Sequence, residues 1–386
     1  MKDSRLAGFH LLTRSARVKK LQASGWVSAA DLAGLKAGGF DVHLLQEMSE
    51  NMVSFMALPV GVVPNVVVNG VPRLVPMATE EPSVIAACSK AAKLAGHGGG
   101  VTACAGERRI GAQVLVDTDA SDEDLVELIG VHKELFMEQV ASYHPRLVAA
   151  GGSVEEISFR RLELNSGKSV VFDILCNPAD AMGANFANDI AERWARFLAH
   201  ILPCELHGAI VTNQPLGRPA KASVRIPFDA LATKGEEGAS VAAKIEALSN
   251  WAMHDPLRSV THVKGILNGV FAVMTPLYQD VRAQAVAVSA FCSSQAAATL
   301  CQWSVQEGRL VGNLVMPMVC GTAGGTGPHV DTTSTYYRWM KVERAGELEE
   351  VLATVGLLQN LGALLAIATE GIQKGHMKLH ERKQKR

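Results

Sequence analysis

The stretch that decides the fold runs from Glu50 to Ala87 and reads ENMVSFMALPVGVVPNVVVNGVPRLVPMATEEPSVIAA. Two Val-rich runs flank Asn69-Gly70, which is a strong signal for a two-residue hairpin turn. Pro82 suits the first position of a helix, because its missing N–H would have no partner inside the helix there. The segment therefore predicts strand, turn and strand, and then a carboxylate, Glu81, held where a helix begins. Acidic residues are common at helix starts because they meet the helix dipole favourably, so a purely structural role for Glu81 stays open.

The composition indicates more than one domain, or one large composite domain, in a chain of 386 residues. Apolar residues make up 48% and aromatic residues only 5%, so Ala, Val and Leu must build the core. The formal net charge is −1 and no domain-sized basic block occurs, which argues against a nucleic-acid partner, because phosphates demand a concentrated basic face. The basic tail from Lys374 to Arg386 is expected to be a solvated terminus, with a phosphate-contacting end as the alternative.

The cysteines and the apolar stretches indicate the compartment. The seven cysteines are scattered and never spaced as CxxC, so we expect neither a disulfide framework nor a zinc site, and a cytoplasmic location. The polar start MKDSR does not resemble a signal peptide. The most apolar stretch, from Val351 to Ala368, is interrupted by Gln359 and Asn360, so we expect a buried helix and no membrane span.

The pattern changes at about Arg108, where strands and helices alternate. The expected elements are a strand at 110–116, a helix capped by Ser121, strands at 154–164 and 168–176 with a turn at 165–167, a helix at 183–202 and a strand at 207–213. The order βαββαβ is that of the split, ferredoxin-like arrangement. We therefore expect an α+β fold in which a small domain, residues 108–216, is inserted into a larger one made of residues 1–107 and 217–375.

The larger domain is expected to be mostly helical around its hairpin. Residues 14–48 predict two or three short helices, with Ser28 and Asp41 as possible N-cap residues. Further helices are expected at 82–94, at 240–262, at 280–305, and after the glycine-rich stretch 321–327.

A nucleotide site can be argued only in part from the residues. No GxGxxG motif follows a strand at the head of a βαβ unit, so the usual dinucleotide-binding fold is not supported. The run from Asp180 to Asn185, DAMGAN, instead opens a helix with small residues, which would let a phosphate approach the free N–H groups at the helix start. Helix starts of this composition are also ordinary caps, so the pattern alone leaves both interpretations open.

Five segments in the same order resemble the class II 3-hydroxy-3-methylglutaryl-coenzyme A reductases, the bacterial form of the mevalonate-pathway enzyme. They are the opening segment, DAMGAN, DPLRSVTHVKGILNG (Asp255 to Gly269), YQDVRA around Asp280, and GLLQNLGALLAIATEGIQKGHMKLH (Gly356 to His380). The likeness covers nearly the whole chain. It implies a cytoplasmic homodimer, or an oligomer of dimers, without a metal. It also implies four-electron reduction of 3-hydroxy-3-methylglutaryl-CoA (HMG-CoA) to mevalonate and CoA with two NAD(P)H, or the reverse oxidation.

The resemblance implies four catalytic residues. Lys264 would stabilise the negative charge that builds on the thioester oxygen, although a lone lysine beside glycine is usually solvated. Glu81 would donate a proton. Asp280 would keep Lys264 charged and raise the pKa of Glu81 by like-charge repulsion, against the opposing pull of the helix start. His376 would protonate the leaving CoA thiolate, although a lone histidine is more often a surface residue.

The resemblance also implies substrate and cofactor contacts. Arg258 would grip the free carboxylate of the substrate, assisted by Ser83 and Asn268. The nicotinamide nucleotide would be bound by Asp180, Met182, Gly183, Asn185 and Asn213. His144 stands where NAD-using members place an aspartate, and Arg146 two residues on could pair with a 2′-phosphate, so NADPH is expected over NADH.

The chain departs from the family pattern in three places. Ser54 replaces a glycine, His10 replaces an arginine that contacts CoA, and the sequence stops ten residues beyond His376, where the family continues as a helical flap. Residues 376–386 would be the remnant of that flap. The alternatives are a related acyl-CoA reductase with a changed acyl group, and a non-catalytic or impaired CoA- or nucleotide-binding relative.

Overall fold

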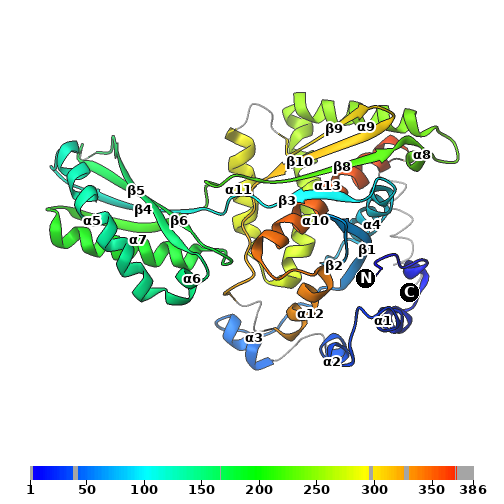
Figure 1. The fold of residues 1–386 in the computed structure, drawn as a ribbon, viewed down its shortest axis with the longest axis horizontal. Coiled ribbons are helices and arrows are strands. Elements are labelled where there is room, and N and C mark those ends of the chain that lie inside the picture. The colour runs from blue at the N-terminus through cyan, green and yellow to red at the C-terminus, as the bar shows by residue number, and fades with distance from the viewer. Residues whose placement is uncertain are drawn as a thin grey trace.

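Two β-sheets, one of six strands and one of four, organise the chain, and each has its own buried core. The computed structural model describes residues 3–37, 42–165, 167–294, 299–325, 330–369 and 371. Figure 1 shows the two sheets in separate bodies, joined by two chain connections that run side by side. The α+β class expected from the sequence is confirmed.

The opening segment folds as its turn residues predict. Strands β1 (Val60–Val68) and β2 (Val71–Ala78) pair antiparallel, with Val68 opposite Val71. Asn69 and Gly70 between them both have positive φ, 51° and 75°, as the two-residue hairpin turn requires. Helix α4 (Pro82–Gly96) follows, with Glu81 as N-cap and Pro82 in the first turn. Local chemistry alone therefore places Glu81 at the junction of β2 and α4.

The larger sheet is completed by four strands from distant parts of the chain. These are β3 (Val101–Cys104), β8 (Ala220–Pro227), β9 (Cys301–Gln306) and β10 (Arg309–Met316). The strand order is β2-β1-β3-β8-β10-β9.

The helix expected at 280–305 is wrong at its C-terminal end. Helix α11 (Val281–Ser294) ends earlier, and residues 301–305 belong to β9. Cys301 and Trp303 are buried while Gln302 between them is exposed, which is the period of a strand. Glu307 and Gly308 then turn the chain with φ of 47° and 71° into β10. The alternation and the turn were both present in the sequence and outweigh helix propensity here.

Helices surround and fill the larger body (Figure 1). They are η1 (Phe9–Leu11), α1 (Arg14–Ala23), α2 (Ala29–Ala37), α3 (Val42–Met48), α8 (Phe228–Leu231), α9 (Gly238–His254), α10 (Pro256–Met274), η2 (Thr275–Leu277), α12 (Asp331–Met340) and α13 (Ala345–Ala368). Ser28 caps α2 as expected, because its hydroxyl accepts from Asp31 N–H; Asp41 lies outside the described residues. The helical region expected at 240–262 continues to Met274 as α9 and α10, which meet at Asp255.

Helix α13 is the centre of the larger core. It contacts α4, α9, α10 and strands of the sheet, and most of its residues are buried. Among the described residues, α13 is the one helix long and apolar enough to cross a membrane. However, 83% of its most apolar 18-residue stretch lies inside the protein. Its glycines allow close packing: a Cβ on Gly362 would lie 2.8 Å from the carbonyl oxygen of Ala87 in α4.

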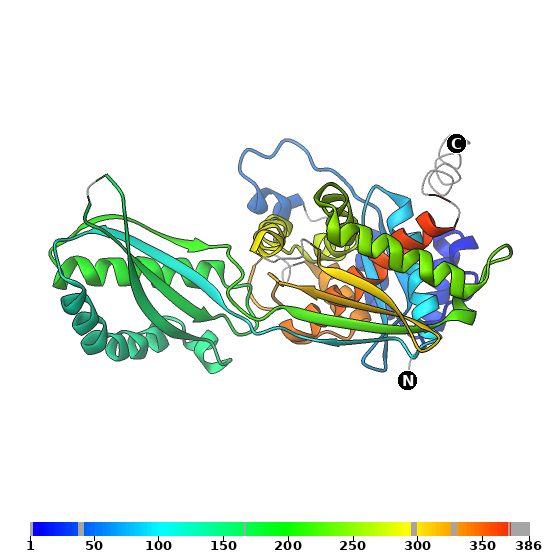
Figure 2. The same ribbon diagram turned by 90° about the horizontal axis from the view of Figure 1, so that it is seen from above.

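The smaller body contains residues 110–212. Its elements are β4 (Ile110–Asp117), α5 (Asp122–Tyr143), α6 (Pro145–Ala149), β5 (Ser153–Leu162), β6 (Ser169–Asn177), α7 (Ala184–Ile201) and β7 (Glu205–Thr212). All neighbouring strands pair antiparallel in the order β5-β6-β4-β7. Phe172, Trp194 and Leu198 are fully buried where α5 and α7 pack on the sheet. Figure 2 shows β4 and β7 leading directly into the connections to the larger body.

Candidate active site

Glu81 is held at the end of β2 by hydrogen bonds of its own backbone and side chain. Its N–H donates to Thr79 Oγ1 at 3.1 Å, and its Oε1 accepts from the N–H of Ser83 at 3.1 Å. The side chains of Glu81 and Ser83 are half-buried. The carboxylate therefore has a fixed direction at the start of α4, two residues from the serine expected to contact substrate.

Helix α10 carries the lysine and the expected substrate residues. Asp255 caps it by accepting from Leu257 N–H at 2.9 Å and Arg258 N–H at 3.4 Å. Lys264 is exposed and Asn268 is half-buried. The spacing of four residues places both on one face of the helix.

Arg258 has the properties of an anion-binding residue. It is half-buried, and its guanidinium lies 5.7 Å from the centre of the Trp251 ring. Burial lowers the pKa of Arg258. Within the part of the chain that the structure describes, no carboxylate forms an ion pair with it. A half-buried cation of this kind is stabilised by an incoming carboxylate.

Asp280 begins α11. Its Oδ1 accepts from the N–H groups of Arg282 and Ala283, at 3.0 Å each, and lies 3.5 Å from Arg282 Nε. The elements that bear Glu81, Lys264 and Asp280 are in contact, because α10 packs on α4 and β2, and η2 just before Asp280 packs on α10 and β2. Among the described residues, the ion pair of Asp280 is with Arg282 and not with Lys264. His376 lies outside the described residues.

The nucleotide motif opens α7 as a left-handed glycine turn. Gly183 is the N-cap with φ of 105°, and a Cβ there would lie 2.7 Å from the Cβ of Pro178. The next residues are the half-buried Ala184 and the exposed Asn185. The first N–H groups of a helix have no partner inside it, so this small-residue start fits a phosphate.

Asp180 forms hydrogen bonds with residues of the larger body. Its Oδ1 accepts from the N–H of Ala345 at 2.8 Å, at the start of α13. Its carbonyl oxygen accepts from the N–H groups of Thr322 and Ala323 at 2.8 and 3.1 Å. The glycine-rich stretch is thus part of the site, a role that sequence reasoning missed. The clustered glycines at 321–325 were the available signal.

Arg108 is a second residue that sequence reasoning missed. Its guanidinium donates to the carbonyl oxygens of Ala179, Ala181 and Cys320 at 2.7, 2.6 and 2.8 Å, and it forms an ion pair with Glu349 of α13. Glu349 is only 2% exposed, and burial raises its pKa against the opposing effect of the Arg108 charge. Nothing local in the sequence marks this arginine.

The expected 2′-phosphate region contains a carboxylate that the sequence did not reveal. His144 Nε2 lies 2.7 Å from Asp189 Oδ2, and Arg193 Nε donates to the same oxygen at 2.6 Å. Burial alone would raise the pKa of Asp189, but hydrogen bonds from Arg193 and His144 outweigh it and lower the pKa. Arg146, in α6, is exposed.

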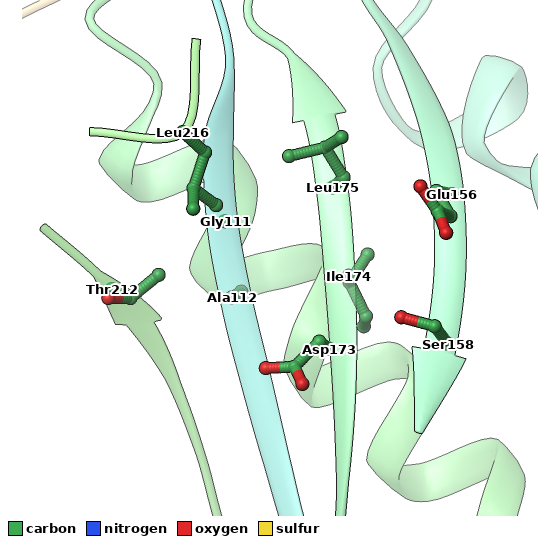
Figure 3. A pocket seen from close by; sticks show the side chains of 9 residues that line it. All are labelled: Gly111, Ala112, Glu156, Ser158, Asp173, Ile174, Leu175, Thr212 and Leu216. Atoms are coloured by element: carbon green, nitrogen blue, oxygen red, sulfur yellow. The ribbon is translucent and has the colours of Figure 1, made fainter. Parts of the chain in front are cut away.

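Two hollows involve residues of the smaller body, and the lining of one of them includes Met182 of the nucleotide motif. One of about 50 Å³ lies between the bodies, and its lining includes Arg108, Met182, Asn213 and Cys320. The other, of about 180 Å³, lies on the smaller sheet (Figure 3), where Glu156 and Ser158 project from β5, Asp173 from β6 and Thr212 from β7. Closed small-molecule pockets have volumes of roughly 300 Å³ or more. Both hollows are smaller than this. No group of three or more potential metal ligands occurs in the described ranges.

Comparison with known proteins places these features in a family. The model of the hydroxymethylglutaryl-coenzyme A reductase family matches residues 13–381. The chain belongs to this family of oxidoreductases. The 3-hydroxy-3-methylglutaryl-coenzyme A reductase of Archaeoglobus fulgidus is 34% identical over 385 residues, covering 98% of this chain and 86% of that protein. A probable reductase of Borreliella burgdorferi is 31% identical over 341 residues, covering 88% and 78%.

Solved structures agree with the family assignment. The class II reductase of Streptococcus pneumoniae bound to NADPH in open conformations has a TM-score of 0.86 and 30% identity, with 94% of this chain and 99% of that chain covered. Another structure of the enzyme from that organism has a TM-score of 0.87 and 31% identity, with 97% and 90% covered. The resemblance of the chain to the class II reductases is thereby confirmed.

Proposed function

We propose that the chain reduces HMG-CoA to (R)-mevalonate: HMG-CoA + 2 NADPH + 2 H⁺ → mevalonate + CoA + 2 NADP⁺. The observation that carries the proposal is the family match over residues 13–381. It is supported by the packing of β2, α4, α10 and η2, the elements that bear or adjoin Glu81, Lys264 and Asp280. The same residues would serve the reverse oxidation.

The chemistry assigns one task to each of four side chains. Lys264 stabilises the oxyanion formed from the thioester and later from the aldehyde, because a fixed cation is most effective where charge develops. Glu81 donates the proton to the alcohol oxygen, and Asp280 acts electrostatically on both. His376 protonates the CoA thiolate when mevaldyl-CoA breaks down to mevaldehyde. NADPH supplies the two hydrides.

Substrate binding is assigned to α10 and the start of α4. Arg258 holds the free carboxylate, an assignment supported by its lowered pKa and by the lack of an ion-pair partner in the described ranges. Asn268 and Ser83 bond the same end of the substrate. This arrangement selects acyl groups that carry a carboxylate over plain acyl groups.

Nucleotide binding is assigned to the smaller body, residues 108–216, inserted in the larger domain of residues 1–107 and 217–375. Asp180, Met182, Gly183, Asn185 and Asn213 hold the nucleotide at the start of α7 and beside the hollow between the bodies. NADPH is preferred over NADH because Arg146 is exposed beside His144 and can pair with a 2′-phosphate. Asp189 is already held by His144 and Arg193, so it is a poor acceptor for ribose hydroxyls.

The active form is proposed to be a cytoplasmic homodimer. Leu257 and Val260 on α10 are 86% and 71% exposed, close to Lys264. Val53 and Met56 in the segment between α3 and β1 are 98% and 81% exposed, and Figure 2 shows this segment arching outward. Exposed apolar side chains that gather beside a site are typical of an interface. A second copy covering it would also exclude water from Lys264.

The decrease in absorbance at 340 nm upon adding HMG-CoA tests the proposal, with NADPH and NADH compared at equal concentration. Oxidation of two NADPH per mevalonate formed is expected, with a higher kcat/KM for NADPH. The function would be refuted if HMG-CoA caused no oxidation of NADPH or NADH and if mevalonate with CoA caused no reduction of NADP⁺ or NAD⁺. A preference for NADH would refute the assignment of Arg146 alone.

A further inference from the structure

The side chain of Gln279 grips the peptide of Gly321 with two hydrogen bonds. Its Nε2 donates to the carbonyl oxygen of Gly321 at 2.9 Å, and the N–H of Gly321 donates to its Oε1 at 2.9 Å. Nε2 also lies 3.1 Å from the hydroxyl of Tyr337. An N–H can only donate and a carbonyl can only accept, so these partners fix the orientation of the amide.

Gly321 in turn lies against the nucleotide motif. A Cβ on Gly321 would lie 2.4 Å from the backbone nitrogen of Met182 and 2.7 Å from the carbonyl carbon of Ala181, so only glycine fits. The next two residues, Thr322 and Ala323, donate their N–H groups to the carbonyl oxygen of Asp180. The glycine-rich stretch and the nucleotide motif are therefore one packed unit.

Gln279 directly precedes Asp280. The carboxylate of Asp280 is turned toward the start of α11, while the neighbouring amide holds Gly321. A chain of direct contacts thus runs from the proposed acid–base side of the site, through Gln279 and Gly321, to the Ala181–Met182 peptide.

We propose that Gln279 is a positioning residue: through the Gly321 peptide it fixes the position of the nucleotide motif relative to Asp280 and the other proposed acid–base residues. The proposal rests on the proposed function for its kinetic consequence, but the mechanical link can be tested without turnover. Hydride transfer is steep in donor–acceptor distance, and misplacement by about 1 Å can cost roughly 100-fold in rate. A polar link with two defined bonds holds such a distance better than apolar contacts do.

The chain offers a matched control in Gln284. Its Nε2 donates to the carbonyl oxygen of Pro317 at 2.8 Å, and its Oε1 accepts from the N–H of Val319 at 2.7 Å. Gln284 therefore makes the same pair of hydrogen bonds to the segment between β10 and α12 that Gln279 makes, but to Pro317 and Val319 instead of Gly321. Gln284→Leu therefore removes two hydrogen bonds to the segment between β10 and α12 but keeps those between Gln279 and Gly321, which lies against the nucleotide motif.

Amide hydrogen exchange of the ligand-free full chain tests the link. In Gln279→Leu, exchange at Ala181, Thr322 and Ala323 is expected to rise by about tenfold, because the loss of two bonds lets the unit open locally. In Gln284→Leu it should stay near the wild-type rate. The isosteric Gln279→Glu, which keeps an acceptor for the Gly321 N–H but loses the donor, should fall between. Unchanged exchange in Gln279→Leu, or equal acceleration in both leucine variants, overturns the proposal.

Kinetics test the consequence. Gln279→Glu is expected to lower kcat by roughly 10- to 100-fold. The dissociation constants of NADPH and HMG-CoA should stay near wild type, and the isotope effect with NADPH deuterated at the transferred position should rise. If Gln279 were merely structural, Gln279→Glu would lower the fraction of active enzyme and leave the isotope effect unchanged. That result would overturn the proposal. An inactive wild type would refute the proposed function, while the exchange measurement would still decide the link.

Discussion

Buried His262 lies two residues before Lys264 and makes the stability of the core depend on pH. Asn360 Nδ2 donates to His262 Nε2 at 3.0 Å, and Trp303 Nε1 donates to Asn360 Oδ1 at 2.7 Å. Burial first, and the Arg258 charge second, lower the pKa of His262 to about 4 from its usual 6.5. The folded state therefore favours the neutral ring. This contribution to stability is complete above pH 6.5 and is lost as the pH falls toward 4.

The first prediction follows from that linkage. Between pH 7 and 4.5, the wild type should lose about 2 to 3 kcal/mol more unfolding free energy than His262→Gln, in which an amide oxygen can accept from Asn360. Urea unfolding at both pH values measures this difference. Other titrating groups are common to both proteins and cancel. Parallel pH dependences would show that His262 is not protonated on unfolding in this range.

The second prediction concerns Arg258 and substrate choice. Arg258→Lys keeps the charge but loses the planar pair of donors, so KM for HMG-CoA should rise by roughly 10- to 100-fold, the value of hydrogen bonds to a charged group. KM for NADPH should not change. Steady-state assays with each substrate varied in turn provide the measurement. An unchanged KM for HMG-CoA would refute the carboxylate contact, whereas equal increases in both KM values would show a disturbed α10.

At the level of elements, a buried ion pair joins Glu349 of α13 to Arg108, whose guanidinium also donates to the carbonyl oxygen of Ala181 in the nucleotide motif. Arg108→Met should cost about 3 to 5 kcal/mol of unfolding free energy, because it leaves Glu349 buried without its partner. The double variant Arg108→Met/Glu349→Leu should be more stable than the sum of the two single losses implies. Urea unfolding of all four proteins completes the cycle. Strict additivity would show that the two side chains are not coupled.

The elements that sequence predicted are those with local signals. Asn69-Gly70 and Pro82 defined the hairpin and the start of α4, because turn and cap chemistry acts over a few residues. The strands β9 and β10 were missed although their turn at Glu307-Gly308 was equally local, so that error was one of weighting. The Arg108–Glu349 pair spans 241 positions and Gln279–Gly321 spans 42. No propensity or period encodes such contacts, which is why the residues between the two bodies were found only in the structure.

At the scale of the whole molecule, the exposed apolar surface near Lys264 predicts the assembly. Leu257 and Val260 lie on the solvent side of α10, and burial of each side chain in an interface would contribute roughly 1.5 to 3 kcal/mol. In the proposed dimer, Leu257→Asp/Val260→Asp should therefore convert the assembly to monomers. It should also lower kcat, because Lys264 loses the cover of the second copy. Neither residue is assigned a contact with substrate, so this loss would not come from a lost substrate contact. Light scattering coupled to size exclusion measures the mass.

The matched control places a charge on an equally exposed apolar residue elsewhere. Val131 on α5 is 64% exposed, close to the 71% of Val260, but belongs to the smaller body. Val131→Asp should leave both mass and activity at the wild-type level. If the α10 double variant stays dimeric, the interface lies on another face. If it becomes a fully active monomer, one chain alone must complete the surroundings of Lys264, and the requirement for a second copy is wrong.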